Sequence, residues 1–583
     1  MRRKKSSNKS FNAVSLKKSH SLNAISQVVI VGEGRDEFNK RYLKFAVRGS
    51  DINIPPISVE TLVNDPKALF AALSNAGWNA FTRKVRDELL EKLQQRKPSD
   101  PSFKVVTRMG WNSGAYVFPC KIIGKPRKQL EKAFDGLDQV MQEKYRTKGT
   151  LNDWRRQIGA LCKDNSRLMF SVSLALTGPI LTLVEGPKAG GFQLWGEPES
   201  GKTTAAMVAG SVWGCHRGGR REMGFTESWN STAGKVEVTA LAHNDALLIL
   251  DETKRAGKDD RERAKVVTSV AFGLAEMTEK ERLTNQGAVR WWRCYFLSTS
   301  NFSLRELGRR VGIVIDDADR GRMADIPLPI NGHGIYENLH GFPSGQKLSD
   351  KLRQRCRKYN GTPAPEFVRQ IDQELKANKG GLKNFLSTER AVYRKALRVA
   401  VKAGTLKEPL GRISGRYATV FAAGSVAIKY DILPWNQKRL LRAILSCQLD
   451  QIRQVDDDAD SAGPSSESLR AKLLQYFNDH YAEFIYLYKK RPRLGTDKID
   501  SVPGYRDKIK GERWYYLTAD QLKTIIGTGE SARVLKQTLV TEGLLAQKTK
   551  GKFVVQRKIF SGGKRNENYA WVHAFKADIR KTQ

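Results

Sequence analysis

Three short apolar runs in the middle of the chain, each leading into polar residues, predict buried strands of a parallel β-sheet. They are Gly191–Trp195, Asp245–Glu252 and Cys294–Asn301. Continuous apolar runs of this length are typical of strands covered on both faces. A longer apolar stretch, Leu168–Val184, contains serines, threonines, a glycine and a proline. It predicts a buried helix pair leading into this core rather than a membrane span. The centre of the chain is therefore expected to be an α/β domain.

The flanking patterns divide the rest of the chain. Residues 1–25 hold seven Lys or Arg, six serines and no acids, which predicts a disordered basic arm that attracts phosphates or is an inert tail. The helical pattern Lys67–Gln95 and the strand pattern Ala115–Phe118 indicate a mixed α/β N-terminal region over 26–150. The remaining expected segments are the core over 151–335, a helical region over 336–453, an acidic flexible linker over 454–468 and a C-terminal domain over 469–583.

The C-terminal domain shows the order helix, helix, hairpin. Helices are predicted over Thr518–Ile526 and Ser531–Glu542, hairpin strands over Leu544–Gln547 and Phe553–Val555, and a further strand over Tyr569–Val572. This is the order of a winged helix, in which the second helix approaches duplex DNA and the wing contacts the backbone.

Basic residues crowd the predicted wing. A run of charge is often only a solvated face, but in this fold pattern it favours contacts with DNA phosphates that orient the chain without reading sequence. The residues are Lys548, Lys550, Lys552, Arg557, Lys558, Lys564 and Arg565.

A phosphate-binding pattern follows the first strand of the core. Gly196–Thr204 fits G-x-x-x-x-G-K-[ST], in which the glycines let backbone N–H groups point at phosphate oxygens. We expect Lys202 to reach the β- and γ-phosphates of ATP and Thr203 to bind Mg²⁺. A lysine-bearing turn is the alternative, and the strand before the pattern and the helix after it favour the nucleotide. The expected nucleotide contacts are Gly196, Glu197, Pro198, Glu199, Ser200, Gly201, Lys202, Thr203 and Thr204.

Two acids end the second strand. Asp251 is expected to hold the Mg²⁺ shell and Glu252 to polarise the attacking water, and this pairing predicts hydrolysis. Ordinary acids at an exposed strand end are the alternative, which the neighbouring phosphate pattern makes the weaker one. At the end of the third strand, Asn301 or Thr299 is the candidate for positioning the water; either is also explained as a strand-end cap.

An arginine after the third strand is a candidate for completing a neighbouring subunit's site. Arg322 could reach the γ-phosphate held by another subunit as an arginine finger, although solvated charge explains it equally well. Other arginines nearby are Arg309, Arg310 and Arg320. Between the acidic and the third strand, Lys280, Arg282 and Arg290 lie in a segment that we interpret as a DNA-contacting pore loop, with an ordinary surface loop as the alternative.

The overall charge predicts a polyanionic partner. The chain of 583 residues carries 101 Lys and Arg against 61 Asp and Glu, a formal net charge of +40. Nucleic acid is the expected partner, because no segment favours a membrane. Six cysteines without metal-type pairing fit a reducing cytoplasm and argue against a zinc site.

Several motifs of this chain resemble the DUF927 family. They are Arg108–Trp111, Ser171–Leu176, Ser228–Glu237, His243–Asp245 with Leu250–Glu252, Leu297–Thr299, and Arg322 with Asp325–Pro327. The match is expected over about 100–450, and the helical region with Gly411–Ala427 fits its downstream part. Members of this family occur in prophages and integrative elements, and the best understood resemble self-loading replicative helicases of staphylococcal cassette elements, related to minichromosome-maintenance ATPases.

The resemblance implies an α/β P-loop AAA+ ATPase core with a helical lid over 336–453 and a C-terminal winged helix. It further implies a homo-hexameric ring around single-stranded or forked DNA in a bacterial cytoplasm. Lys202, Thr203, Asp251 and Glu252 would form the hydrolysis set. The ending Ser298–Asn301 departs from the Ser-Thr-Gly-Glu-like ending expected of the family. The resulting hypothesis is an ATP-dependent helicase or translocase of a mobile element; the alternative is a nucleotide-switched DNA-binding ATPase that does not unwind.

Overall fold

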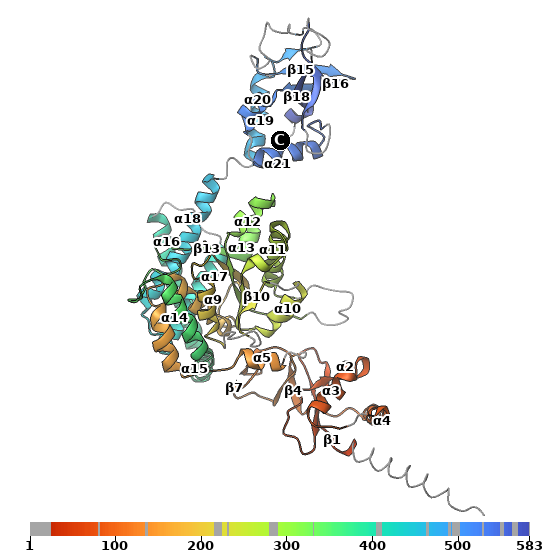
Figure 1. The fold of residues 1–583 in the computed structure, drawn as a ribbon, viewed down its shortest axis with the longest axis vertical. Helices are drawn as coiled ribbons and strands as arrows, with labels where there is room; N and C mark the ends of the chain where they lie inside the picture. Colours follow the sequence, from red (N-terminus) through yellow and green to blue (C-terminus); the bar gives the residue numbers. More distant parts are fainter. Residues whose placement is uncertain are drawn as a thin grey trace, which may run out of the picture. The chain divides into compact units, whose positions relative to one another are not determined.

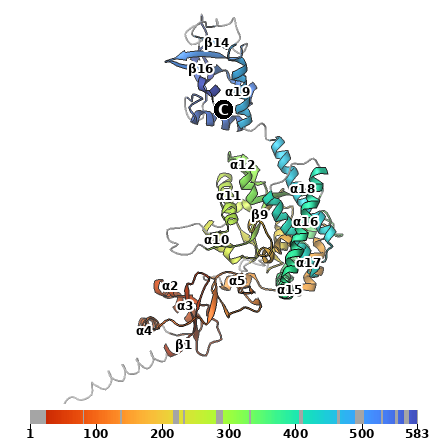
Figure 2. The same ribbon diagram turned by 180° about the vertical axis from the view of Figure 1, so that it is seen from behind.

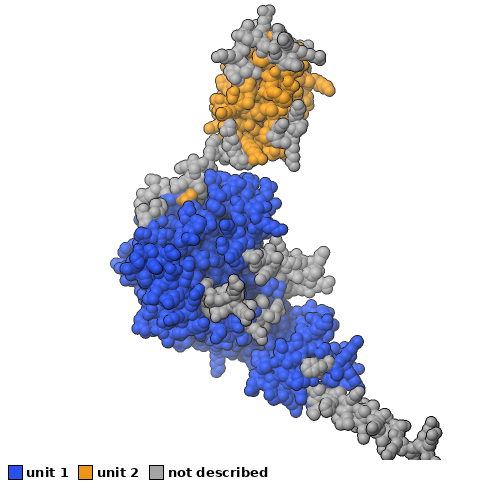
Figure 3. Space-filling view, in the orientation of Figure 1, with its two compact units in different colours: residues 1–453 blue, residues 454–583 orange. Residues whose placement is uncertain are grey.

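A computed structural model describes the protein in two compact units, residues 1–453 and 454–583 (Figure 3). The described residues are 25–79, 82–134, 138–214, 224–229, 233–278, 290–329, 332–403, 411–461, 466–487, 491, 502–527, 530–547, 553–561 and 569–581. The predicted basic arm therefore lies almost wholly outside them, and so do Lys280, Arg282, Lys548, Lys550 and Lys552.

The first unit begins with a five-stranded sheet of order β3-β2-β1-β4-β8. Its strands are β1 (Val28–Arg35), β2 (Arg41–Val47), β3 (Ile57–Ser58), β4 (Phe103–Val106) and β8 (Leu130–Lys132). Helices α2 (Val59–Asn64), α3 (Lys67–Asn75), α4 (Arg83–Gln94) and α5 (Asp138–Lys144) accompany it, as does a small sheet of β5 (Gly110–Asn112), β6 (Ala115–Val117) and β7 (Ile122–Gly124). The mixed α/β character predicted for this region is present in the structure.

The single helical pattern predicted from Lys67 to Gln95 is two helices, α3 and α4. Gly77 has a φ of +92°, a left-handed conformation that ends α3, and its N–H donates to Ser74 O at 3.0 Å. The next residue, Trp78, is fully buried. The turn therefore ends α3 and places the Trp78 side chain in the hydrophobic core of this region.

The centre of the first unit is a second sheet of order β10-β11-β12-β9-β13, in which all paired strands are parallel. The strands are β9 (Gly190–Trp195), β10 (Glu227–Ser228), β11 (Leu247–Asp251), β12 (Tyr295–Ser300) and β13 (Met323–Pro327). β9, β11 and β12 correspond to the three predicted strands. All residues of β12 are buried, and in β9 and β11 every residue except the last is buried. The reason is that helices cover both faces of the sheet.

The helices of the core lie around this sheet. They are α6 (Leu151–Trp154), η1 (Arg155–Gly159), α7 (Ala160–Cys162), α8 (Ser166–Ala175), η2 (Gly178–Ile180), α9 (Lys202–Gly210), α10 (Ala233–Ala242), η3 (Thr253–Arg255), α11 (Asp260–Glu276), α12 (Leu304–Val311) and α13 (Asp317–Arg322). All ten residues of α8 are buried, so the predicted buried helix pair is one helix followed by the short turn η2. Among the described residues no helix has both the length and the apolar composition to cross a membrane.

Five helices follow the core sheet and gather on the side away from α10 to α12 (Figures 1 and 2). They are α14 (Gly345–Lys358), α15 (Pro363–Ala377), α16 (Lys379–Ala403), α17 (Gly411–Lys429) and α18 (Gln437–Ser461). These helices lie within the predicted helical region over 336–453 and extend past its end. The predicted linker differs: α18 continues to Ser461 and α19 (Ser466–His480) starts at Ser466, so much of the acidic stretch is helical.

The second unit packs helices on one face of a sheet of order β14-β15-β16-β18-β17. Its further elements are β14 (Ile485–Tyr486), β15 (Tyr505–Ile509), β16 (Glu512–Leu517), α20 (Ala519–Ile526), α21 (Glu530–Thr541), β17 (Val555–Lys558), β18 (Tyr569–Lys576) and η4 (Ala577–Lys581). α20, α21 and β18 lie where helices and a strand were predicted. Phe477 of α19, Leu522 of α20 and Leu535 of α21 meet Phe575 of β18 in one hydrophobic core.

The hairpin of this unit is formed by other strands than the sequence predicted. Leu544–Gln547 contains only an isolated bridge from Leu545 to Phe575, and β17 begins at Val555, where the predicted strand ends. β18 pairs with β16 along one edge and with β17 along the other. Ala546 N donates to Ala574 O and Lys576 N donates to Leu544 O, both at 2.9 Å, so the 544–546 segment pairs with one end of a β18 edge. β17 pairs with the rest of that edge, and the hairpin is β17–β18.

Candidate nucleotide-binding site

The strand order brings the predicted site residues to one edge of the core sheet. β12 lies between β9 and β11, and the carboxyl ends of parallel strands meet at the same edge. The Gly196–Thr204 segment follows β9, Asp251 and Glu252 end β11, and Thr299 lies near the end of β12. The topology therefore places Thr299 between the phosphate-binding pattern and the acidic pair.

The Gly196–Thr204 segment has the backbone of an anion-binding loop. Gly196 and Gly201 have φ of +146° and +95°, and Glu199 adopts +59°. A side chain at Gly196 would start 2.4 Å from Leu328, so glycine is required there by space as well as by backbone conformation. Gly201 caps α9, whose N-terminus points its free N–H groups at the centre of the loop.

Lys202 lies inside this loop. Its Nζ donates hydrogen bonds to Gly196 O at 2.8 Å, Glu197 O at 2.5 Å and Ser200 Oγ at 3.1 Å. Burial lowers its pKa, and the charges of Glu197 and Asp251 act in the opposite direction. The ammonium thus occupies the middle of the loop, where its present partners are weak oxygen acceptors that a phosphate would replace.

Two threonine hydroxyls contact the Asp251 carboxylate at this edge of the sheet. Thr299 Oγ1 donates to Asp251 Oδ1 at 2.6 Å, and Thr203 Oγ1 approaches the same oxygen at 3.3 Å. Burial raises the pKa of the Asp251 carboxyl, although both hydroxyls act to lower it. Thr203 and Asp251 together offer hard oxygen atoms of the kind that Mg²⁺ prefers, with the remaining ligands left to phosphate and water.

Glu252 contacts Thr299 through its backbone and Arg255 through its carboxylate. Its N–H donates to Thr299 Oγ1 at 2.8 Å, and its φ of +64° and ψ of +82° turn the chain at the end of β11. The side chain is about half exposed and pairs with Arg255 at 3.2 Å. A strained backbone at a half-exposed carboxylate is a frequent property of functional residues. Thr299 therefore contacts the Asp251 carboxylate and the Glu252 backbone at once.

The other two predicted residues lie at opposite ends of the sheet. Asn301 follows Ser300, whose carbonyl accepts a hydrogen bond from Gly196 N at 3.3 Å, so Asn301 is next to the start of the loop. Arg322 precedes β13, whose first residue pairs with Gly191 and whose last pairs with Trp195. Arg322 is therefore about 16 Å, the length of β13, from the loop edge of its own chain.

The side chain of Arg322 is held on α11. Its guanidinium lies 4.1 Å from the ring centroid of Phe272 and 3.7 Å from Glu276. Its carbonyl accepts a hydrogen bond from the buried Arg416 at 3.3 Å. In this position it cannot complete the site of its own chain.

A loop that the sequence did not mark covers the phosphate-binding segment. Ile335 N donates to Ser200 O at 2.9 Å, and a side chain on Gly334 would start 2.2 Å from the same oxygen. Arg353 of α14 donates from Nε to Thr204 Oγ1 at 3.2 Å. The spacing of Gly332 and Gly334 after β13 was the available signal for the loop; nothing in the local sequence marks Arg353.

Two of the sequence motifs are joined below the site. Asp245 is fully buried. Its carboxylate accepts hydrogen bonds from Nε and Nη2 of Arg293 at 2.6 and 2.9 Å. Its Oδ2 also accepts the N–H of Trp111 at 3.0 Å, and Asn244 donates to Met109 O at 2.8 Å. The Arg108–Trp111 motif of the N-terminal region is thus fastened to the start of β11, the strand that ends in Asp251.

Comparison with known families matches residues 18–293 to the model described as "Domain of unknown function (DUF927)". The chain contains a DUF927 domain. The match starts and ends earlier than the range of about 100–450 expected from the motifs, so it includes most of the N-terminal region and stops before β12. Both joined motifs, the phosphate-binding loop and Asp251 lie within it.

Among solved structures, the chain is similar to one described as "SCCmec type IV Cch - active helicase", with 14% sequence identity, a TM-score of 0.52 and 95% of each chain covered. At this identity the likeness concerns the fold: the DUF927 domain and the region C-terminal to it share a mixed α/β fold with a helicase along nearly their whole length. No curated protein matches the chain.

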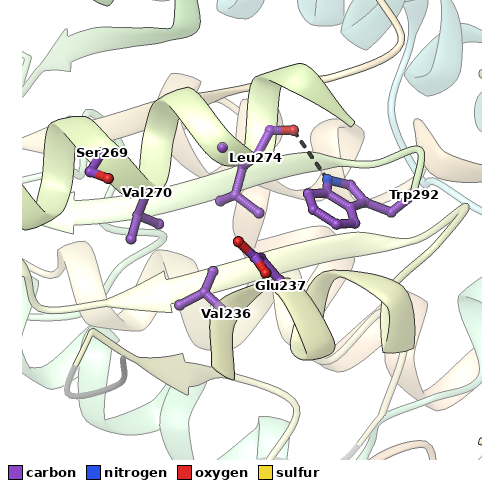
Figure 4. Close-up of a pocket in the computed structure, with 7 residues that line it drawn as sticks. Val236, Glu237, Ser269, Val270, Leu274 and Trp292 are labelled. Atoms are coloured by element: carbon purple, nitrogen blue, oxygen red, sulfur yellow. Dashed lines mark hydrogen bonds between the residues drawn. The ribbon is translucent and has the colours of Figure 1, made fainter. Parts of the chain in front are cut away.

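A small cavity in the DUF927 domain lies apart from the sheet edge that carries the Gly196–Thr204 segment. It opens between α10 and α11, where Trp292 Nε1 donates to Leu274 O at 3.2 Å (Figure 4). Its lining is Val236, Glu237, Ser269, Val270, Gly273, Leu274 and Trp292. It contains neither the loop nor the acidic pair, so we place the candidate nucleotide site at the sheet edge and not in this cavity.

In the first unit, the structure describes Arg290 among the predicted DNA contacts, half-buried at the start of residues 290–329. In the second unit, it describes Arg557 and Lys558. Both are on β17, with Lys558 exposed and Arg557 half-buried. Arg557 Nη1 donates to Gln556 O at 3.2 Å. Lys280 and Arg282 of the core and Lys548, Lys550, Lys552, Lys564 and Arg565 of the predicted wing lie outside the described residues, so their roles stay predictions.

Proposed function

We propose that the protein is an ATP-dependent DNA helicase or translocase, with an AAA+ core, a helical lid formed by α14 to α18, and a winged helix in the second unit. The observation that carries the proposal is the arrangement of Lys202, Thr203, Asp251 and Thr299 at one edge of a parallel sheet. This arrangement provides one group for each requirement of phosphoryl transfer to water.

Each residue has a defined part in hydrolysis. The loop N–H groups and Lys202 would neutralise the β- and γ-phosphates, which carry the charge that develops in the transition state. Thr203 and Asp251 would hold Mg²⁺, which would supply positive charge against the phosphates. Glu252 would orient the attacking water after its pair with Arg255 opens. Thr299 fixes the relative positions of the two acids, and Asn301 or Thr299 contacts the water.

The charge and the fold of the chain both support DNA as the partner along which the protein moves. The net charge of +40 favours a polyanionic partner. The second unit has three helices packed on a sheet with a basic hairpin, and a solved helicase has a similar fold along 95% of the chain. We propose that the winged helix holds the DNA and that Lys280 and Arg282 contact it within a ring.

A ring is supported by the position of Arg322. Its distance from the loop of its own chain excludes action there, while a neighbouring copy could receive it as a finger. Glu276 and Phe272 hold the guanidinium at the surface of α11, where Phe272 is 43% exposed. We propose a homo-oligomer, most simply a hexamer, that acts in a bacterial cytoplasm on the replication of a mobile element.

Strand displacement tests the proposal. A forked duplex with either a 3′ or a 5′ single-stranded arm is incubated with the wild-type chain, with and without ATP, and the released strand is measured on a native gel. The proposal expects ATP-dependent release from at least one fork and none with Lys202→Ala. ATP hydrolysis and DNA binding without release from either fork would instead support the nucleotide-switched DNA-binding ATPase.

A further inference from the structure

One face of β18 is exposed at the start of the strand and buried at its end. Tyr569, Trp571, His573 and Phe575 share one face, because successive side chains of a strand alternate. Phe575 is 0% exposed in the core formed with α19 to α21, and His573 is 5% exposed. Tyr569 and Trp571 remain 41% and 51% exposed. The helices thus cover one half of this face and leave its aromatic half at the surface.

The neighbouring strand adds polar groups to the same surface. In the antiparallel β17–β18 pair, Lys558 lies opposite Tyr569 and Gln556 lies opposite Trp571. Directly paired residues point to the same face, and both Lys558 and Gln556 are exposed. The outer end of the hairpin therefore presents two aromatic rings with an ammonium and an amide beside them.

We propose that Tyr569, Trp571 and Lys558 form a stacking surface for unpaired DNA bases. This inference rests on the proposed function and adds the form of DNA that the hairpin recognises. Aromatic rings bind bases of any sequence, because every base has a π-face, and a cation alongside contacts the phosphates. Residues 530–583 contain 12 Lys or Arg against 4 Asp or Glu, so the surroundings favour a polyanion over an apolar protein partner.

The spacing of the rings favours a single strand over a duplex. Residues two apart on a strand are separated by roughly 7 Å, about twice the rise per nucleotide of a stacked DNA strand. Each ring can therefore meet its own base only where the bases have separated. In a duplex the faces of the bases are covered by their stacked neighbours, and only edges and phosphates are offered.

Fluorescence anisotropy of the full chain tests this inference. The probes are a labelled oligothymidine strand and a blunt duplex of the same length. Trp571→Ala and Tyr569→Ala should each weaken single-strand binding roughly five- to hundredfold, the range for loss of one base–aromatic stack, and leave duplex binding unchanged. Trp571→Phe should keep most of the single-strand affinity. Ile509→Ala removes another exposed apolar side chain of this unit, 37% exposed, and should change neither affinity.

The possible outcomes separate this inference from the proposed function. Single-strand binding that is unchanged in both alanine variants would overturn the stacking surface alone. An equal loss on both probes would also overturn it, because it would indicate contact with the phosphate backbone. If the wild-type chain binds neither probe, the proposed function fails together with the inference.

Discussion

The backbone N–H of Trp111 donates a hydrogen bond to the carboxylate of Asp245 at 3.0 Å, across 134 positions of the chain. Arg293 binds the same carboxylate with two nitrogens, and Tyr116 donates to the Asp245 carbonyl at 2.6 Å. Asp245 has a φ of +56° and stands two positions before β11. The contact makes the position of the acidic strand depend on the N-terminal region.

A substitution at Gly110 should disturb the contact between Trp111 and Asp245 directly. It has a φ of +101°, and an added Cβ would start 2.4 Å from Asp245 Oδ2. Gly110→Ala should lower the free energy of unfolding through both backbone strain and displacement of the buried carboxylate. Gly114→Ala is the matched control, because its φ of +87° is similar but its nearest neighbour is 3.9 Å away. We expect the Gly110 variant to lose about 1–3 kcal/mol more than the control in urea titrations; equal losses would show that the carboxylate contact contributes nothing.

Thr299 should control hydrolysis by holding both acids. Thr299→Val keeps the shape of the side chain and removes the hydrogen bonds to Asp251 and to Glu252 N. Because a hydrogen bond to a charged group contributes about 1.5–3 kcal/mol, we expect kcat for ATP hydrolysis to fall roughly 10- to 100-fold. Thr299→Ser should restore most of it, and both variants should still bind a fluorescent ATP analogue. Normal turnover in Thr299→Val would leave Asn301 as the candidate for positioning the water.

Glu252 should act in the chemical step and not in binding. Its carboxylate is half exposed and forms an ion pair with Arg255, so Glu252→Gln leaves the loop and Asp251 unchanged. We expect nucleotide affinity to stay within about twofold while turnover falls at least roughly 100-fold, as for loss of a general base. Lys202→Ala, in contrast, should weaken nucleotide binding itself. An active Glu252→Gln variant would assign the water to another group.

His243 should make the first unit less stable in mild acid. Burial lowers its pKa from 6.5 to about 4, while the charges of Glu227 and Lys144 act in opposite directions. Its Nδ1–H donates to Thr239 O at 2.8 Å, and its ring is fully buried. The unfolded chain takes up a proton near pH 6.5 that the folded chain refuses until about pH 4, so stability falls as the pH drops through this window.

The measurement is urea unfolding of the full chain at several pH values from about 7 to about 5, within the window where the two states differ in bound protons. His243→Asn preserves the donor to Thr239 O and removes the titration, and it should reduce the acid-induced loss of stability. His573, whose pKa burial also lowers to about 4, lies in the second unit and serves as the comparison. The same pH dependence in wild type and His243→Asn would show that His243 does not titrate differently on folding.

The sequence predicted the core more fully than its surroundings, for physical reasons. Strands buried on both faces and a glycine-bounded phosphate pattern are local signals, so β9, β11, β12 and the neighbourhood of Lys202 could be predicted. The loop through Ile335 and the contact of Arg353 with Thr204 depend on tertiary packing of α14, which no local pattern specifies. Likewise the choice of β17 as the partner of β18 is a competition between strand edges, and β-propensity alone does not decide it.

The trans role of Arg322 can be tested by mixing two inactive variants. Lys202→Ala lacks a functional loop but keeps Arg322, while Arg322→Ala keeps the loop but lacks the arginine; each alone should have little ATPase activity. In a mixed ring, the loop of an Arg322→Ala subunit can receive Arg322 from a Lys202→Ala neighbour, so activity should reappear and be greatest near equal amounts. Arg309→Ala, which removes a surface arginine paired with Glu306, should be active alone. If the mixture stays inactive while native mass spectrometry shows that mixed rings form, Arg322 acts by holding the packing of α11 and α13 within its own chain.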